Sequence, residues 1–340
     1  MSQKEAYGYA VARIRAMELR LLDAAVFARL QDADDTASVL KILGETSYAS
    51  VLTSVSGETA FDKILETALH ETYEELASFV PNRTLVSMMR LPYDFSNVKV
   101  MLKSFFNVRS GGKKRWDLLT SLASYPVDSL ISEIESEDYR LLPFGLSELY
   151  PKCLSLWEQS RDTLETERML DQQMYRVMLA EAEKLAMPEI ISWTRLRIDG
   201  ENIRSLLRLR RFGYDASRAL PFLHEGGYID LNMLAPMIAE PFETWGRMLS
   251  FSDFAPLLGS IDAASGFAEI IMDLERDLDN FYFDVIAKSR YYPDAPGNVT
   301  SYLWAKEMEV KNIRMIIVSK SNKKDKDQVR RLLRHVYISA

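Results

Sequence analysis

The sequence predicts an all-α protein, and three observations support this fold class. Glycine (14) and proline (12) are scarce among the 340 residues, which argues against a turn-rich β fold. Apolar residues recur with helical periodicity along most of the chain, and we find no clear run with the alternation of a strand. Prolines lie between the helical runs, as helix boundaries require; they are Pro81, Pro126, Pro143, Pro188, Pro221, Pro293 and Pro296.

The predicted helices follow in chain order. The first carries Val11, Ile14 and Leu22 on one side. Apolar periodicity predicts further helices over residues 37–43, 59–80, 164–186, 263–290 and 302–319. Two loops that combine glycine with polar residues, 107–114 and 212–228, indicate domain boundaries.

Composition limits the classes of function. A hydrophobic content of 47% lets each third of the chain bury a core, and a net charge of −7 argues against general nucleic-acid binding. The single cysteine excludes a disulfide framework, and one cysteine with three histidines makes a metal site of those residues improbable. The first ten residues lack the apolar core of a signal peptide, and no run is long enough to cross a bilayer, so we expect a soluble intracellular protein.

One short pattern occurs three times: an acid, an asparagine three residues later, a β-branched residue and a cation. The copies are Asp94-x-x-Asn97-Val98-Lys99, Asp199-x-x-Asn202-Ile203-Arg204 and Glu309-x-x-Asn312-Ile313-Arg314. The asparagines are 105 and 110 residues apart, a period too long for a solenoid repeat. Each copy is therefore expected to belong to a small domain of its own.

A second landmark supports the repeat. An aromatic residue between two apolar ones precedes each asparagine, by 49, 63 and 58 residues. The three sets are Leu43, Tyr48 and Val51; Ile134, Tyr139 and Leu142; and Leu249, Phe254 and Leu257. Together the landmarks predict three similar helical modules, over residues 1–110, 111–214 and 215–340.

The repeated motif has three interpretations. On a helix the asparagine lies at the edge of an apolar stripe, where its amide can satisfy a backbone group of a crossing helix. The acid can pair with the asparagine or cap the helix start, which Pro92 and Gly200 favour for Asp94 and Asp199. In this first interpretation the motif locks helix packing. Alternatively, the three cations line a shared central surface, or the motif is catalytic.

The sequence contains no convincing catalytic or metal-binding motif. Residues 111–114 form a flexible basic loop rather than a P-loop. Glu66 and His70 lack the second copy that a di-iron bundle requires. The aspartates of residues 32–35 lack isoprenoid-synthase spacing, and we interpret them as a loop and helix cap. We predict no catalytic, cofactor-binding or metal residue.

Other polar and sulfur-containing residues receive structural interpretations. The acids between positions 273 and 279 alternate with Arg276 and resemble a solvent-facing helix side. Cys153, next to leucines, is interpreted as a small core residue.

Two basic clusters are candidate docking sites. The segment 320–334 has a net charge of about +5 in an acidic chain. It is either a solvated face or a docking patch for acidic loops of a partner. The same two interpretations apply to the arginines near position 208. The candidate docking residues are Arg208, Arg211, Lys323, Lys324, Arg330 and Arg331.

The three motif copies and the chain length resemble the C subunit of V-type and archaeal-type ATPases or ATP synthases, whose eukaryotic counterpart is the d subunit. Asp199-Gly200-Glu201-Asn202-Ile203-Arg204 and Glu309-Val310-Lys311-Asn312-Ile313-Arg314 are the copies most similar to that family. The start, Tyr7-Gly8-Tyr9-Ala10-x-x-Arg13-Ile14-Arg15, is similar too. The first copy departs from the pattern, with Lys99 for arginine and Pro92 just upstream.

This resemblance implies three helical lobes around a pseudo-threefold axis, forming a funnel. It implies a non-catalytic rotor component between the D and F subunits of the central stalk and the membrane proteolipid ring, with no cofactor. The protein would be monomeric alone and held at the inner face of a membrane by the complex. Two alternatives stay open: a three-lobed helical adaptor of another assembly, and an all-α enzyme that holds magnesium with acidic clusters.

Overall fold

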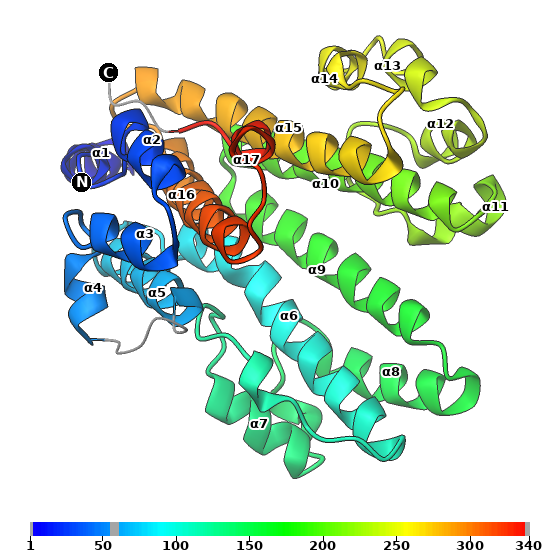
Figure 1. Cartoon of the computed structure of the whole chain (residues 1–340). Coiled ribbons are helices and arrows are strands. Elements are labelled where there is room, and N and C mark those ends of the chain that lie inside the picture. Colours follow the sequence, from blue (N-terminus) through cyan, green and yellow to red (C-terminus); the bar gives the residue numbers. More distant parts are fainter. Residues whose placement is uncertain (1–2, 55–60, 337–340) are drawn as a thin grey trace. The chain divides into compact units, whose positions relative to one another are not determined.

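The computed structural model describes residues 3–54 and 61–336 (Figure 1). Helices are the only regular elements in those two ranges, which confirms the all-α class. The predicted ranges 37–43, 164–186 and 302–319 correspond to α3 (Thr36–Leu43), α9 (Thr163–Leu185) and α16 (Gly297–Ser321). The predicted start at Thr59 lies outside the described residues, and α5 is described from Phe61 to Phe79.

The first predicted helix is two helices. α1 (Gln3–Glu18) ends before Leu22, and α2 (Ala24–Asp32) starts shortly after it. Asp23 causes the break, because its carboxylate accepts a hydrogen bond from the Val26 amide and caps α2. The periodic apolar positions on both sides of this cap hid it from the sequence analysis.

The contacts divide the chain into two compact units. Unit 1 comprises residues 1–86 and 240–340, and unit 2 comprises residues 87–239. One boundary lies within α6 (Thr84–Arg109), which is a single helix that contains Pro92. We describe each unit by itself.

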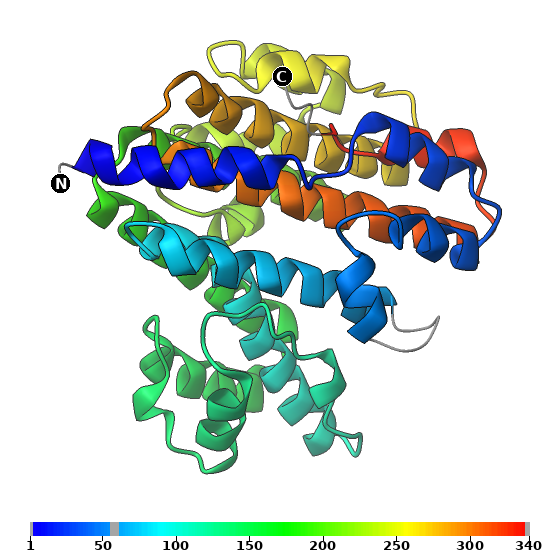
Figure 2. The same cartoon turned by 90° about the vertical axis from the view of Figure 1, so that its left-hand side faces the viewer.

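Unit 1 is built around α16. Four consecutive residues of α16, from Tyr302 to Ala305, are buried, so the helix is covered on all sides. Its neighbours α1, α5 and α15 (Phe267–Ala287) lie along it (Figure 2). The other elements of unit 1 are α4 (Ala49–Ser54), η6 (Phe242–Thr244), α13 (Trp245–Met248), α14 (Ala255–Ser260), η7 (Lys288–Tyr291) and α17 (Lys326–Leu332).

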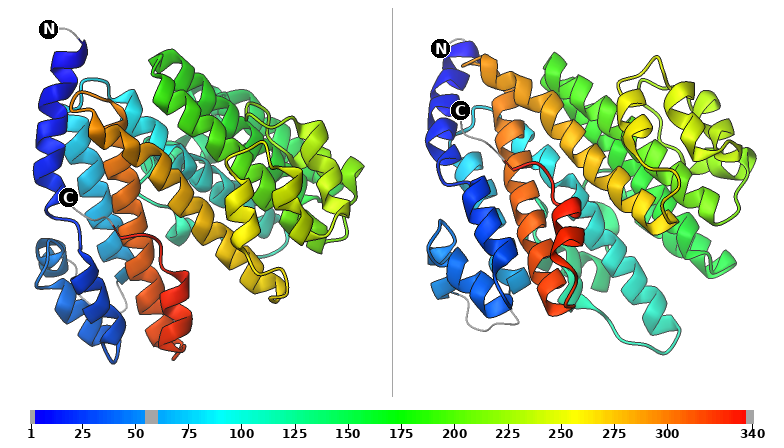
Figure 3. Two further views of the ribbon diagram at one scale, coloured as in Figure 1. Left: turned by 90° about the horizontal axis from the view of Figure 1, so that it is seen from above. Right: turned by 45° about the horizontal axis from the view of Figure 1, so that its top comes forward.

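Unit 2 centres on the hairpin of α9 and α10 (Pro188–Arg211), which lie side by side (Figure 3). Ala186 ends α9 in the left-handed conformation, and Pro188 occupies the first turn of α10, where its missing N–H costs nothing. Cys153 is fully buried, which confirms its interpretation as a core residue. The other elements are η2 (Trp116–Leu118), α7 (Val127–Glu135), η3 (Tyr139–Leu141), α8 (Leu146–Ser160), α11 (Ala216–Ala219), η4 (Leu220–Phe222), α12 (Leu231–Leu234) and η5 (Ala235–Ala239).

The aromatic landmark has the same local structure in two of its three copies. Tyr48 and Phe254 are buried, and each amide donates to the hydroxyl of the residue two positions earlier, Thr46 or Ser252. Both hydroxyls in turn donate to the carbonyl of the landmark leucine. Tyr139 differs: it is only half-buried and follows Glu137, whose φ is 57°.

Candidate functional site

The three motif asparagines lie in the middle of the long helices α6, α10 and α16. Asn97, Asn202 and Asn312 have 1%, 0% and 1% of their surface exposed. The positions of Asp94 and Asp199 inside α6 and α10 show that the predicted helix-capping role is wrong. Pro92 and Gly200 are tolerated within these helices and do not start them.

Each asparagine holds the backbone of a segment that follows it by 22 or 23 residues. Asn97 Nδ2 donates to the Thr120 carbonyl (2.9 Å), and the Thr120 amide donates to Asn97 Oδ1 (2.8 Å). Asn202 binds the carbonyl and amide of His224 in the same way, at 2.8 and 2.7 Å. Asn312 binds those of Arg334 at 3.1 and 2.9 Å. We call each pair an asparagine clamp.

The clamp explains why asparagine is needed. Its side-chain amide has one N–H side and one C=O side, so it pairs with a peptide group as another peptide group would. Because the contact is to the backbone, the clamped residue can be of any type, and Thr120, His224 and Arg334 have nothing in common. The expected partner was a crossing helix; the structure shows a non-helical segment, whose amide and carbonyl have no intrahelical partners.

The acids of the first two copies hold the same segment about five residues further on. Asp94 accepts from the Tyr125 amide and the Ser124 hydroxyl, both at 2.8 Å. Asp199 accepts from the amides of Tyr228 (2.8 Å) and Ile229 (3.1 Å). In both copies the acid and the asparagine, one helical turn apart, therefore bind two points of one returning segment.

Burial changes the acidity of these two carboxyl groups. Removal from water raises the pKa of Asp94 to about 6, although the hydrogen bonds from Tyr125 and Ser124 oppose the shift. The pKa of Asp199 is likewise raised to about 6 by burial, against the hydrogen bonds from Tyr228 and Ile229. The two copies thus share geometry and electrostatics.

An arginine that the sequence analysis missed completes the first two copies. Arg90 lies four residues before Asp94 and donates to the carbonyls of Leu122 (2.7 Å) and Ala123 (2.9 Å). Arg195 lies four residues before Asp199 and donates to the Gly226 carbonyl (3.2 Å). A signal existed in the sequence: Arg-Leu precedes both aspartates at the same distance, whereas the third copy has Ala-Lys there.

The third acid has other partners. Glu309 Oε2 accepts from the Leu22 amide (2.5 Å), and Oε1 accepts from the Tyr48 hydroxyl (2.8 Å) and Lys306 Nζ (2.6 Å). Lys306 Nζ also lies 3.1 Å from the Tyr48 oxygen, and all three side chains are buried. Glu309 therefore joins α16 to the turn between α1 and α2 and to the aromatic landmark.

The three motif cations are each paired inside their own unit. Lys99 Nζ lies 2.5 Å from Asp171 Oδ1, and Arg204 pairs with Glu201 on the same helix. Arg314 Nε lies 2.8 Å from Asp62 Oδ1. These pairs favour the packing interpretation of the motif, since the charges are used to join or brace helices.

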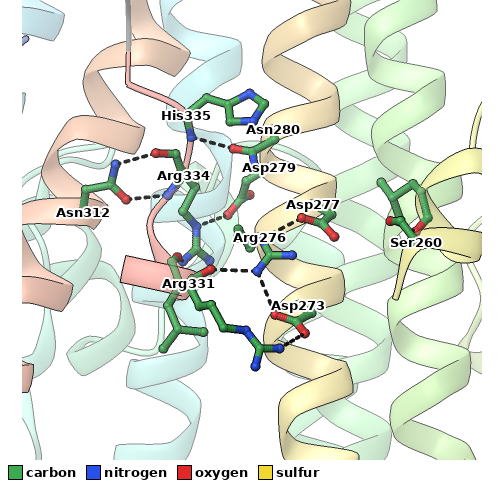
Figure 4. A network of polar contacts seen from close by, with 12 residues as sticks. Ser260, Asp273, Arg276, Asp277, Asp279, Asn280, Asn312, Arg331, Arg334 and His335 are labelled. Atoms are coloured by element: carbon green, nitrogen blue, oxygen red, sulfur yellow. Dashed lines mark hydrogen bonds and ion pairs between the residues drawn. The ribbon is translucent and has the colours of Figure 1, made fainter. Parts of the chain in front are cut away.

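Three of the seven cations in the basic segment 320–334 pair with described acids of unit 1, and Figure 4 shows two of these pairs. Arg331 pairs with Asp273 at 3.0 Å, and Arg334 pairs with Asp279 at 2.9 Å. The predicted solvent-facing role of the 273–279 acids is thus wrong for Asp273, which is buried, and a later segment covers this face of α15. Asp35 caps α3, which confirms the helix-cap interpretation of the 32–35 cluster.

The candidate docking residues are all exposed. Lys323 and Lys324 follow the end of α16, and Arg208 and Arg211 lie in the last turn of α10. Arg330 donates to Gln31 Oε1 (3.3 Å), and Arg331 is the partner of Asp273. Lys323 has a φ of 51°, a left-handed conformation that lysine adopts at a cost.

Unit 2 also contains an open groove of about 700 Å³ beside α9. Arg168 and Gln172 line it, but both donate to the Pro221 carbonyl, and Arg168 also pairs with Glu165. Within residues 3–54 and 61–336, no group of three or more His, Cys, Asp or Glu residues could hold a metal ion. No helix in the described part is long and apolar enough to cross a bilayer.

Comparison with known proteins gives matches over nearly the whole length. Residues 10–332 match the family described as ATP synthase (C/AC39) subunit. The chain is 27% identical over 330 residues to the C subunit of the A-type ATP synthase of Thermococcus onnurineus, covering 91% of this chain and 85% of the relative. It is 23% identical over 334 residues to the C subunit of the V-type sodium ATPase of Enterococcus hirae, covering 95% and 97%.

Proposed function

This chain belongs to the ATP synthase (C/AC39) subunit family, and from that membership we propose that it is a non-catalytic part of the rotor. In this proposal it joins the D and F subunits of the central stalk of an A-type or V-type rotary ATPase to the membrane proteolipid ring and passes torque between them. The family match over residues 10–332 carries the proposal, because it includes all three motif copies. The complex would hold the protein at the inner face of a membrane.

The asparagine clamps support a mechanical role. A part that transmits torque must be stiff, and each clamp ties the middle of a long helix to a distant segment through two hydrogen bonds. These bonds are buried in the second and third clamps and partly buried in the first. Asp94 and Asp199 add a second attachment about five residues along the same segments. Deformation of such a region requires breaking several buried hydrogen bonds together.

The proposal includes three similar lobes around a pseudo-threefold axis, with modules 1–110, 111–214 and 215–340. The boundaries at 110 and 214 each lie between an asparagine and the segment that it clamps. In this scheme each of the first two modules supplies a long helix, and the beginning of the next module closes over it. The clamps would then connect consecutive modules.

Exposed cations are the proposed docking residues. Lys323 and Lys324 project from the end of α16, and neither is in an ion pair among the described residues. Arg208 and Arg211 form a second exposed group at the end of α10. Attraction between such groups and acidic loops would speed and orient assembly more than it would raise affinity.

Binding to purified partners tests this function. The chain should be monomeric alone, should not hydrolyse ATP, and should bind a D–F complex and the detergent-solubilised proteolipid ring. If the chain bound neither partner, the coupling role would be refuted. Binding to only one of them would refute torque transfer by this chain while keeping it in the complex.

Charge reversal tests the docking residues separately. Lys323→Glu with Lys324→Glu should weaken binding to one of the two partners by at least about tenfold at low salt. The control is Lys152→Glu on α8, an exposed lysine outside the proposed docking groups. Equal affinities for the variant and the control would show that these lysines do not dock a partner.

A further inference from the structure

The segment held by the third clamp is attached differently from the other two. Residues 325–336, which we call the latch, comprise α17 and the extended residues after it. Within the latch Val329 and Arg334 are buried, Leu332 and Leu333 are half-buried, and most other residues are exposed. The segments of the first two clamps each bury at least two apolar residues: Leu122 and Ala123 in one, and Leu223 and Ile229 in the other. The latch therefore buries fewer apolar side chains completely than the other two segments do, so the hydrophobic effect contributes less to its attachment.

Polar contacts hold the latch on α15, α16 and α2, and Figure 4 shows those on α15 and α16. Lys326 Nζ donates to the Asp32 carbonyl and Arg330 Nε to Gln31 Oε1, both at 3.3 Å. Arg276 Nη1 of α15 donates to the Arg331 carbonyl (2.7 Å). Besides the Asn312 clamp, Arg331 Nη2 donates to Asp273 Oδ2 (3.0 Å), and Arg334 Nε donates to Asp279 Oδ2 (2.9 Å). The His335 amide donates to Asn280 Oδ1 (2.8 Å). The motif acid Glu309 adds no hydrogen bond to the latch, because Leu22, Tyr48 and Lys306 occupy it.

The acids under the latch do not depend on it for charge compensation. Asp273 also pairs with Arg276 (2.8 Å), and Asp279 also pairs with Lys311 (2.5 Å). If the latch left, each carboxylate would keep a cation, and the side chains of Asn280 and Asn312 would be free to bind water. Departure would therefore leave no buried unpaired charge, which is the usual large cost of breaking such contacts.

From these contacts we propose that the latch opens reversibly while the rest of unit 1 stays folded. Lys323 is the hinge, since it lies just after α16 in the left-handed conformation, shortly before the latch. Opening exposes the Asn312 amide to water. Because charged groups provide most of the attachment, salt favours the open state.

Hydrogen exchange of the full-length protein, followed by mass spectrometry, tests the proposal. The amide of Arg334 should exchange at least about tenfold faster than those of Thr120 and His224, which are in the same kind of clamp. Raising KCl to about 0.5 M should speed exchange in the latch several-fold and leave the other two clamps unchanged. Exchange of the latch at the rate of α16, or without salt dependence, would overturn the proposal.

A matched pair of variants identifies the contacts responsible. Asp273→Asn removes the partner of Arg331 and should speed latch exchange and tryptic cleavage after Arg330 or Arg331 several-fold. Glu269→Gln, on the exposed side of α15, removes an acid that contacts neither the latch nor Arg276 among the described residues, so it should change neither rate. Equal effects of the two variants, with no change in the Arg334 amide, would also overturn the proposal. This test does not depend on the proposed function, because no partner is present.

Discussion

A β-carbon built on Gly227 would lie 2.0 Å from Oδ1 of Asp199, closer than any real side chain could approach. The absence of a side chain at Gly227 lets the returning backbone reach the buried carboxylate, which then binds the next two amides, of Tyr228 and Ile229. The corresponding residue of the first copy is Ala123, where the Ser124 hydroxyl makes one of the two contacts to Asp94. In one copy Gly227 lets two backbone amides reach the carboxylate, and in the other the Ser124 hydroxyl replaces one of those amides.

Gly227→Ala is expected to destabilise unit 2 by about 2–3 kcal/mol, because the new methyl group forces the segment away from Asp199. Urea unfolding followed by circular dichroism measures the loss. Gly259→Ala is the control, since a β-carbon there meets nothing within 4 Å. In an Asp199→Ser background Gly227→Ala should cost less, because the shorter side chain leaves room; an equal cost would contradict the clash.

Asn202→Leu should lower stability by about 2–3 kcal/mol, because the amide and carbonyl of His224 would both lose a buried partner. Asn312→Leu should cost less, because its clamped segment can leave and hydrate its peptide groups. The unfolding midpoint in urea reports both changes. The exposed Asn322→Leu provides a control that is expected to change stability by less than about 0.5 kcal/mol. An unchanged midpoint for Asn202→Leu would rule out the clamp as a stabilising element.

Stability should depend on pH through Asp94 and Asp199. Their folded pKa of about 6 lies above the ordinary 3.8, so the folded state binds more protons between those values. Each group therefore stabilises the fold most at the acidic end of this window, and the contribution is lost as pH rises through about 6. Across this window the free energy of unfolding that each group contributes falls by roughly 2–3 kcal/mol.

Comparison with the variant Asp94→Asn/Asp199→Asn isolates this effect from other titrating groups. The free energy of unfolding of the wild type minus that of the variant should become smaller between pH 4.5 and pH 7.5. A difference independent of pH would show that these carboxyl groups titrate at ordinary values.

Arg90→Lys should destabilise unit 2 by about 1–2 kcal/mol, because one ammonium group cannot reproduce the paired contacts of the guanidinium to Leu122 and Ala123. Arg176→Lys, on α9, is the matched control, since its hydrogen bond to Gln173 is exposed. Thermal unfolding distinguishes them. Similar melting temperatures for both variants would mean that the Arg90 contacts contribute nothing to stability.

Glu309→Gln should destabilise unit 1 by about 3 kcal/mol or more, because Lys306 would remain buried without its carboxylate. Replacing both residues, as Lys306→Met with Glu309→Gln, should restore part of the loss. Denaturant unfolding of the two variants measures this. If the double variant were less stable than the single one, the charge on Lys306 would not be the cause.

The sequence predicts several of the helices, α3, α9 and α16 among them, and shows the repeated asparagines, but it does not predict the partners of those asparagines. The helical period places Asn202 at the edge of an apolar stripe, so its burial was predictable. His224 was not predictable as its partner, because the clamp binds a peptide group and leaves no requirement on the clamped side chain. Asp273 was interpreted as solvent-facing because the pattern of one helix does not show which later segment covers it.

Local patterns in the sequence therefore determined the all-α class, several of the long helices and the threefold recurrence of the motif, since these depend on residues a few positions apart. Only the tertiary structure decided that the first two motif acids lie inside helices, that Arg90 and Arg195 belong to the motif, and that Glu309 contacts Lys306 and Tyr48. These contacts join residues between 3 and 261 positions apart, and the arginines and asparagines make theirs to backbone groups. Every residue carries the same backbone carbonyl, so composition and spacing could not reveal them.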